Sequence, residues 1–336
     1  MENIENPNLE TQENVNFQSR IDLQPLQESI TTIKKELSSV IVGQHKMIDQ
    51  LLVAILSNGH VLLEGVPGVA KTITAKLLAK TLQINFSRIQ FTPDLMPSDI
   101  LGTSVFDLKK SEFEFKKGPV FSNLILIDEI NRAPAKTQAA LFEVMEERQI
   151  TMDGTTYPLS APFLVIATQN PVEQEGTYRL PEAQLDRFLF KINIDYPKLE
   201  EEIHIIQREH ALQNHGKLDA IQPVLSASDI IKYQALVKQI IIEPHLLEYI
   251  AQLVVNTREN AFLYLGASPR ASIAILNAVK GYAAIRGRDF VTPEDIKEAA
   301  IPVLQHRVIV TPEREMEGIS STEIIKQIIE TIEIPR

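Results

Sequence analysis

Residues 60–72 read HVLLEGVPGVAKT, a short apolar run followed by a loop with two glycines and then by a lysine and a threonine. The loop matches the pattern G-x-x-x-x-G-K-[ST], except that Ala70 stands where the pattern has its second glycine. In such loops backbone N–H groups and the next helix N-terminus hold phosphate, the lysine reaches the β- and γ-phosphates, and the hydroxyl ligates magnesium. The stretch therefore predicts a strand, a phosphate-binding loop and a helix, with an ordinary Gly-Pro turn as the alternative.

A pair of acids, Asp128 and Glu129, directly follows the apolar run at 124–127. Acids in this position are expected to protrude at the carboxyl end of a core strand, where open α/β sheets bind ligands. Asp128 would then hold magnesium, and Glu129 would polarise the water that attacks the γ-phosphate. The alternative is that Asp128 only caps the next helix.

Three more polar positions follow along the chain. Asn170 comes after the apolar run 163–167, where its amide would hydrogen-bond the γ-phosphate and the attacking water, although Asn before Pro is also common in turns. Arg187 lies in LDRF, at 185–188, and Arg270 lies in the expected first turn of a helix. Single arginines are usually surface residues in salt bridges, so their significance rests on their order after the loop and the two strand ends.

Composition and net charge limit the classes of protein to which the chain can belong. The chain has 336 residues, 44% hydrophobic and 23% charged, which suggests two globular domains at roughly 150 residues each. A net charge of −11 disfavours general binding to nucleic-acid backbones or anionic membranes. The absence of cysteine excludes disulfides, thiolate zinc sites and cysteine nucleophiles. A polar, acidic N-terminus and the lack of a membrane-length apolar run predict a cytoplasmic protein.

An α/β half is predicted over residues 21–197, and residues 1–20, rich in Asn, Glu and Gln, are predicted to be a flexible tail. Helical patterns begin at Leu26 and His45. We then expect strands at 60–63, 84–91, 124–127, 163–167 and 190–194, and helices at 71–82 and 134–148. Continuous apolar strands separated by helices indicate a parallel sheet that is covered on both faces.

A helical half is predicted over residues 198–336, where helices replace the strand patterns. We expect these helices at about 199–213, 228–239, 244–258, 269–286, 293–304 and 322–332. Ser228 or Asp229 is the expected N-cap of the second helix, and Thr292 is the expected N-cap of the fifth. The segment 197–200 is the candidate hinge between the halves.

Two hairpins are predicted within the α/β half, at 103–117 and 148–160. The first has alternating Phe and Glu after a polar turn, and the second contains Asp-Gly, a strong tight-turn signal. Four lysines lie near phenylalanines in the first hairpin, which hints at nucleic-acid contact, but three acids largely cancel their charge; the lysines are Lys109, Lys110, Lys116 and Lys117. The histidines His204, His210 and His215 lack the spacing of a metal site.

The order of these motifs resembles that of AAA+ ATPases, and their amino-acid sequences resemble those of the MoxR branch. The resemblance is carried by VIVGQ at 40–44, GVPGVAKT at 65–72, DEINRAPAKTQAALFEVMEERQIT at 128–151, YRLPEAQLDRFLFK at 178–191, GASPRAS at 266–272 and RGRDFVTPEDI at 286–296. It covers about residues 25–332, and Ala70 is usual in that branch. The implied fold is a P-loop core with a central parallel sheet and a C-terminal helical lid.

The resemblance assigns roles residue by residue. It places the adenine beside Val42, Gly43 and Gln44, and the phosphates on Gly65, Val66, Pro67, Gly68, Val69, Ala70, Lys71, Thr72 and Ile73. It places Mg²⁺ on Thr72 and Asp128. It makes Glu129 the residue that polarises water and Asn170 sensor 1. Arg187 becomes the finger that completes a neighbour's site, with Arg179 as a rival, and Arg270 becomes sensor 2, in its own site or a neighbour's.

The same resemblance implies an activity and partners. It implies Mg²⁺-dependent ATP hydrolysis by a ring, usually a hexamer, that remodels or matures a protein client with a partner carrying a von Willebrand factor A domain. It also identifies the hairpins as a helix-2 insert and a pre-sensor hairpin facing the pore or substrate side, where local edge hairpins are the alternative. Other functions left open are a helicase-related nucleic-acid motor, a metal-chelatase subunit, and a nucleotide-gated binding module that barely hydrolyses.

Overall fold

The computed structural model describes residues 21–66, 68–170, 178, 180–211 and 221–334. The tail predicted at 1–20 therefore lies outside the described residues, as do Pro67, Arg179 and His215. Among the described helices, none is long and apolar enough to cross a membrane.

A five-stranded sheet forms the centre of the α/β half, and its order is β2-β5-β8-β1-β9. The strands are β1 (His60–Gly65), β2 (Phe86–Gln90), β5 (Leu124–Asp128), β8 (Leu164–Gln169) and β9 (Phe188–Ile194). Every neighbouring pair is parallel, so the carboxyl ends of all five strands lie at one edge. The predicted parallel sheet is confirmed, with strand ends shifted by a few residues.

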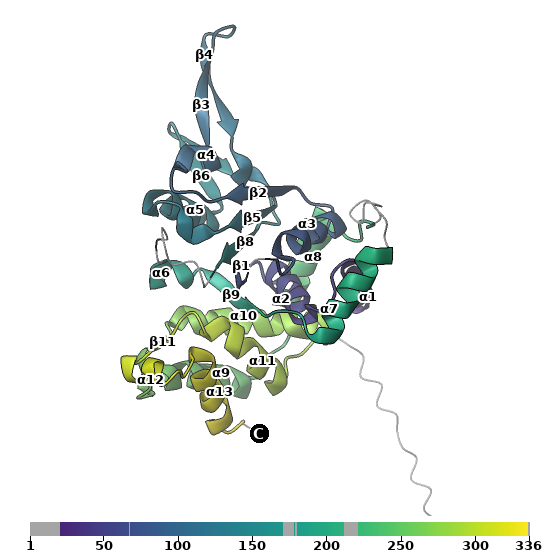
Figure 1. Ribbon diagram of the computed structural model, residues 1–336, viewed down its shortest axis with the longest axis vertical. Coiled ribbons are helices and arrows are strands. Elements are labelled where there is room, and N and C mark those ends of the chain that lie inside the picture. The colour runs from purple at the N-terminus through teal and green to yellow at the C-terminus, as the bar shows by residue number, and fades with distance from the viewer. Residues whose placement is uncertain (1–20, 67, 171–177, 179, 212–220, 335–336) are drawn as a thin grey trace, which may run out of the picture.

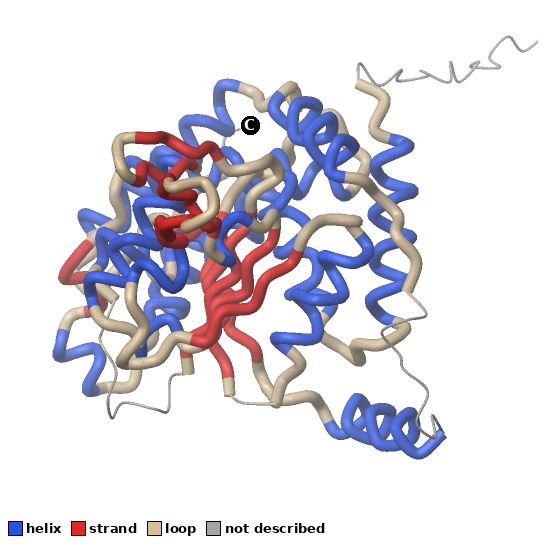
Figure 2. The backbone as a smooth tube through the Cα atoms, turned by 90° about the horizontal axis from the view of Figure 1, so that it is seen from above, coloured by secondary structure: helices blue, strands red, loops and turns tan. Residues whose placement is uncertain are grey.

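Helices cover both faces of this sheet, as Figure 2 shows from above. Alternate residues of β1 point to opposite faces: Val61 and Leu63 join one buried cluster, whereas Leu62 joins the other. The helices supplying the first cluster include α1 (Gln24–Ser38), α2 (His45–Leu56) and α3 (Lys71–Thr81). The second is supplied by α5 (Ala135–Glu147) and by Ile100 of α4 (Pro97–Leu101). Burial on both faces explains why the three central strands, β5, β8 and β1, read as apolar runs, whereas the edge strands β2 and β9 also contain polar residues.

The C-terminal half is helical, as predicted. Its helices are α7 (Leu199–Ala211), α8 (Ala227–Lys238), α9 (Pro244–Glu259), α10 (Pro269–Ile285), α11 (Pro293–Leu304), α12 (Pro312–Met316) and α13 (Ser321–Thr331). A short antiparallel pair that the sequence analysis did not predict, β10 (Leu263–Leu265) with β11 (Ile309–Val310), joins them.

One helix start was predicted wrongly. Ser226, and neither Ser228 nor Asp229, is the N-cap of α8, and its side chain accepts from the Asp229 N–H at 3.3 Å. Asp229 is the N3 residue of this capping box and accepts from the Ser226 N–H at 2.9 Å. The predicted cap at Thr292 is confirmed by the same type of box with Asp295.

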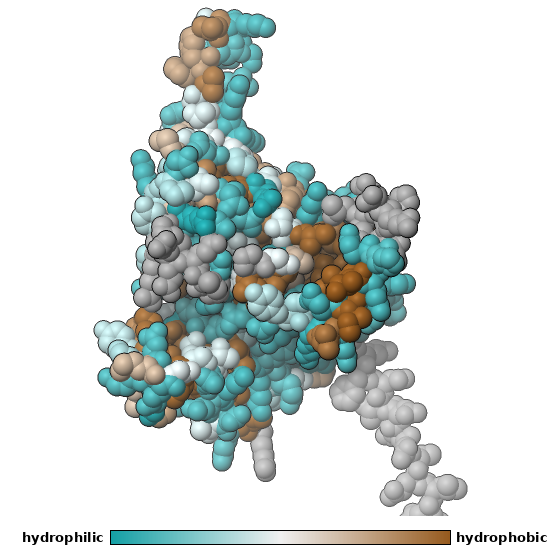
Figure 3. Space-filling model, in the orientation of Figure 1, coloured by the Kyte–Doolittle hydropathy of each residue, from teal (hydrophilic) through white to brown (hydrophobic). Residues whose placement is uncertain are grey.

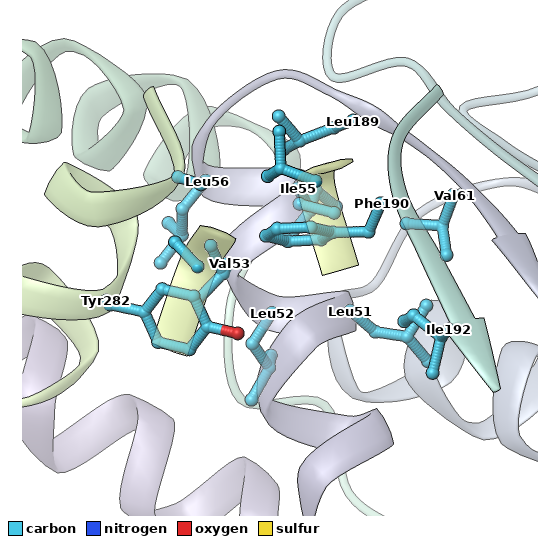
Figure 4. Packing of buried hydrophobic residues seen from close by; sticks show 14 of the residues in the cluster. Leu51, Leu52, Val53, Ile55, Leu56, Val61, Leu189, Phe190, Ile192 and Tyr282 are labelled. Atoms are coloured by element: carbon cyan, nitrogen blue, oxygen red, sulfur yellow. The ribbon is translucent and has the colours of Figure 1, made fainter. Parts of the chain in front are cut away.

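The two halves share a buried cluster. Phe190 of β9 and Tyr282 of α10 are both fully buried, with ring centroids 6.2 Å apart (Figure 4). At Gly281, a Cβ would come within 2.7 Å of Val53 in α2, so only a glycine lets α10 lie this close. The division at residue 197 stays a prediction.

Both expected hairpins are present. The first pairs β3 (Gly102–Asp107) with β4 (Glu112–Lys117) and projects from the body in Figure 1, and the second pairs β6 (Gln149–Met152) with β7 (Thr155–Pro158). The rings of Phe115 and Tyr157 stack at 4.5 Å and join the two. Short helical turns η1 (Pro119–Phe121), η2 (Ile130–Arg132) and α6 (Glu182–Leu185) complete this half.

Candidate nucleotide site

Two described residues of the loop between β1 and α3 have a left-handed backbone. Gly68 and Ala70 have positive φ angles of 87° and 60°, the left-handed region that favours glycine. Ala70 therefore adopts the conformation that the general pattern reserves for its second glycine. At Gly65 a Cβ would lie 2.7 Å from the Ile194 carbonyl oxygen, which explains the glycine there. Lys71 begins α3, and its Nζ donates to the Gly65 carbonyl at 2.6 Å, across the loop.

The acidic pair lies beside this loop at the carboxyl end of β5. Asp128 is buried; it accepts from Arg88 Nε at 2.6 Å and from Thr168 Oγ1 at 3.4 Å. The backbone N–H of Glu129 donates to Thr168 Oγ1 at 3.0 Å. Asp128 does not cap a helix, because Glu129 is the N-cap of η2 and Pro134 is the N-cap of α5, neither with a side-chain cap. That alternative is wrong.

The carboxylate of Glu129 is held from two sides. It accepts from Gln90 Nε2 at 2.9 Å and forms an ion pair with Arg132 Nε at 3.1 Å. Gln90 and Asp128 are register partners in neighbouring strands, so β2 supplies side chains to the acidic pair. The local sequence does not predict these contacts of the acids with Arg88, Gln90, Arg132 and Thr168. The two β2 residues can be found only once β2 is known to lie next to β5.

Lys71 and the acids form one electrostatic group. Burial lowers the pKa of Lys71 below its ordinary value, and Asp128, Glu129 and Glu64 act in the opposite direction by favouring the charged ammonium. Oxygen donors from Thr72 and Asp128 are of the kind that Mg²⁺ prefers. Among the described residues no cluster of three or more acids or histidines could hold a metal alone, so such an ion would need phosphate or water ligands as well.

Two further predicted segments lie at the same edge. Glu64 pairs with Gln169, so Asn170 follows β8 where β1 reaches Gly65. Gly43 and Gln44 have φ angles of 67° and 54°, and Gln44 Nε2 donates to the Asp195 carbonyl at 3.4 Å, just beyond β9. Gln44 and Asn170 therefore lie at the edge of the sheet from which the phosphate loop leaves β1.

Arg187 and Arg270 lie at the opposite end of the sheet. Arg187 precedes Phe188, which pairs with His60 at the start of β1, whereas the loop follows the end of β1 at Gly65. Because a strand rises about 3.3 Å per residue, these ends are roughly 17 Å apart. Both guanidinium groups approach Glu146 of α5, Arg187 at 3.7 Å and Arg270 at 3.5 Å. The structure does not bring either arginine to the loop of its own chain.

Comparisons with known proteins agree with this geometry. The family model described as "ATPase family associated with various cellular activities (AAA)" matches residues 60–190, and an AAA lid domain model matches 255–328. Chaperone MoxR1 of Mycobacterium tuberculosis is 44% identical over 90% of this chain and 81% of its own. The chain belongs to the MoxR family of AAA+ ATPases.

Other relatives support the same family. Uncharacterized protein YeaC of Bacillus subtilis is 44% identical over 94% of this chain and 96% of its own length. A crystal structure from Cytophaga hutchinsonii is 46% identical, with a TM-score of 0.87, and covers 94% of this chain and 97% of that chain. The AAA+ fold with a central parallel sheet and a C-terminal lid is thus confirmed, and membership of the MoxR family indicates a nucleotide-binding ATP hydrolase.

In this MoxR-family chain, the lid holds the segment that carries Arg187. Arg307 is 9% exposed; its Nε pairs with Asp186 Oδ1 at 2.7 Å, and its Nη2 donates to the Phe188 carbonyl at 2.7 Å. Ser268, one residue before α10, donates its Oγ hydrogen to Asp186 Oδ2 at 3.0 Å. The residue before Arg187 is thus fixed by two lid residues, one of them two positions from Arg270.

Asp186→Asn is expected to lower the free energy of unfolding by about 3–5 kcal/mol, because Arg307 would be left buried without its countercharge. Chemical denaturation of both proteins measures this difference. Glu317→Gln is the matched control: its pair with Arg314, at 2.5 Å, is exposed, and its loss should cost about 0–1 kcal/mol. Equal effects of the two substitutions would contradict the assigned importance of the buried pair.

Proposed function

We propose that this chain is a Mg²⁺-dependent ATPase that acts as a ring, with each nucleotide site completed by arginines of the next subunit. The observation that carries the proposal is the separation within one chain. The loop, the acidic pair and Asn170 lie at the carboxyl edge of the sheet, whereas Arg187 and Arg270 lie at its amino end, beside Glu146. Heterologous, head-to-tail contacts that close on themselves bring two such ends together.

Within one subunit, Lys71 would contact the β- and γ-phosphates, and Thr72 and Asp128 would hold Mg²⁺, which neutralises charge on the phosphates when bound. Glu129 would take a proton from the attacking water, and Asn170 would orient that water. The adenine would lie by Val42–Gln44. Gln90 and Arg132 both contact Oε2 of Glu129, so its Oε1 would take the proton from water while Oε2 holds the carboxylate in place.

Between subunits, Arg187 would act as the finger and stabilise charge on the transferred phosphoryl group. Arg270 would act on the same neighbouring site, because both arginines approach Glu146 and share a pocket. The rival Arg179 lies outside the described residues. A hexamer is the proposed ring.

The proposed cellular role is remodelling or maturation of a protein client, together with a partner that carries a von Willebrand factor A domain. The name of the M. tuberculosis relative, Chaperone MoxR1, supports a chaperone-like role. The β3–β4 hairpin presents exposed Phe113 and Leu108 near its tip, apolar side chains of the kind that contact protein segments. A cytoplasmic location stays a prediction.

ATP hydrolysis measured against protein concentration tests the shared site. We expect the rate per subunit to rise steeply with concentration, because each site needs a neighbour, and to fall to background when EDTA removes Mg²⁺. Sedimentation of the same samples with a non-hydrolysable ATP analogue reports assembly directly. A rate per subunit that is constant down to concentrations at which the protein sediments as a monomer would rule out the shared site.

A further inference from the structure

Helix α7 exposes an apolar face that no part of the described chain covers. Leu199, Ile203 and Ile206 are 77%, 44% and 61% exposed, and every described side chain of α7 is at least partly accessible. Figure 3 shows hydrophobic side chains gathered over this helix. A 13-residue helix is marginal in water without packing of its apolar face. Such a face indicates a docking surface.

The attachment of α7 directs this face outward. Arg208 Nη2 donates to the Ser38 carbonyl at 3.1 Å, and the Glu201 carboxyl lies against Gly43, where a Cβ would be 2.7 Å from its carbon. At about 100° per residue, positions 201 and 208 lie on one side of the helix and positions 199, 203 and 206 lie on the other. Polar contacts thus fix α7 to the molecule while its apolar face points away from it.

The position of α7 connects it with the nucleotide edge. The helix begins five residues after β9 ends, and its Glu201 shares a pocket with Gln44, Asp195 and Lys198. It therefore flanks the end of the molecule that, in the proposed ring, faces the arginine end of a neighbour.

The arginine end complements α7 in both charge and hydrophobicity. Among the described residues, the pocket there is lined by four arginines and only two acids, Glu146 and Asp186, so it is basic overall. Ile273, which is 59% exposed, also lines it and lies one turn after Arg270. On α7, Glu200 and Glu202 flank the apolar face, whereas Glu201 faces Gly43 on the other side of the helix. Opposite charges around apolar centres are the arrangement that fixes register between two protein surfaces.

We propose that the face of α7 formed by Leu199, Ile203 and Ile206 is an intersubunit contact, covered by the arginine end of a second copy of this chain, with Ile273 as its apolar counterpart. The inference rests on the proposed ring and adds to it the surface that holds neighbours together. It makes α7 a determinant of assembly that takes no part in the chemistry.

Cross-linking tests the contact. Because the sequence contains no cysteine, the introduced cysteines are the only thiols that can react. One full-length protein carries Ile206→Cys and another carries Ile273→Cys; they are mixed with a non-hydrolysable ATP analogue and treated with a short bismaleimide. We expect a heterodimeric product from this mixture. The control replaces Ile273→Cys with Leu247→Cys, which is 42% exposed on α9 and should not cross-link. Equal yields from the two mixtures would overturn the proposal.

A second variant separates this inference from the ring itself. Ile203→Glu with Ile206→Glu should raise the concentration needed for half-maximal activity about tenfold or more, with an unchanged plateau and unchanged binding of a fluorescent ADP analogue by monomer. The control, Ile231→Glu on α8, 44% exposed, should leave that concentration unchanged. If wild-type activity depends on concentration but the α7 variant behaves as wild type, the result supports the proposed ring and contradicts the proposed α7 contact. If wild-type activity is independent of concentration, the proposed function fails first.

Discussion

Glu129→Gln lowers the rate of ATP hydrolysis by about 10²–10⁴-fold, the contribution expected of a positioned general base. The amide keeps the size of the carboxylate and its ability to accept from Gln90 and Arg132, but it cannot accept a proton from water. The phosphate loop, Asp128 and the Val42–Gln44 segment are untouched, so nucleotide affinity should stay within about a factor of ten. Single-turnover hydrolysis and equilibrium binding of a fluorescent ATP analogue measure the two effects separately.

The control is Glu313→Gln, an exposed carboxylate on α12 that lies outside the site. It removes the same charge from the protein and should leave the hydrolysis rate unchanged. If Glu129→Gln hydrolyses ATP as fast as Glu313→Gln does, then Glu129 is not the general base. If it fails to bind nucleotide, the carboxylate has a structural role in the site instead.

The fold could be predicted because its signals are local. The three central strands β5, β8 and β1 each contain a continuous apolar run, and the acidic pair and the phosphate loop follow two of these runs. Parallel strands place these strand ends at one edge without further information. The N-cap of α8 was harder, because Ser226, Ser228 and Asp229 are all good capping residues, and only backbone geometry selects Ser226.

The contacts around the acids could not be predicted from such local signals. Gln90 approaches Glu129 because β2 lies beside β5, and these residues are 39 positions apart. The same limitation applies to the lid: Arg307 and Asp186 are 121 positions apart, and nothing in either local sequence indicates that they pair. Sheet order and domain packing decide both contacts, and a single sequence does not report them.

Arg187→Ala is expected to lower ATP turnover by about 10³–10⁵-fold, the range of a finger arginine in related phosphoryl-transfer enzymes. The side chain lies far from the loop of its own chain, so nucleotide binding by monomer should be unchanged. Its Nη1 donates to the Phe142 carbonyl at 2.5 Å, at the end of the molecule where a neighbouring subunit would dock. Steady-state hydrolysis at a concentration that saturates wild-type activity measures the loss.

Mixing decides whether this arginine acts on a neighbour. Arg187→Ala subunits retain Lys71, and Lys71→Ala subunits retain Arg187, so random 1:1 assembly gives about one interface in four with both groups intact. Activity should therefore recover to as much as about a quarter of the wild-type rate, although each variant alone is inactive. The matched control mixes Arg187→Ala with a subunit carrying both substitutions, and it should not recover. No recovery in the first mixture, when sedimentation shows that mixed rings have formed, would place the function of Arg187 within its own subunit.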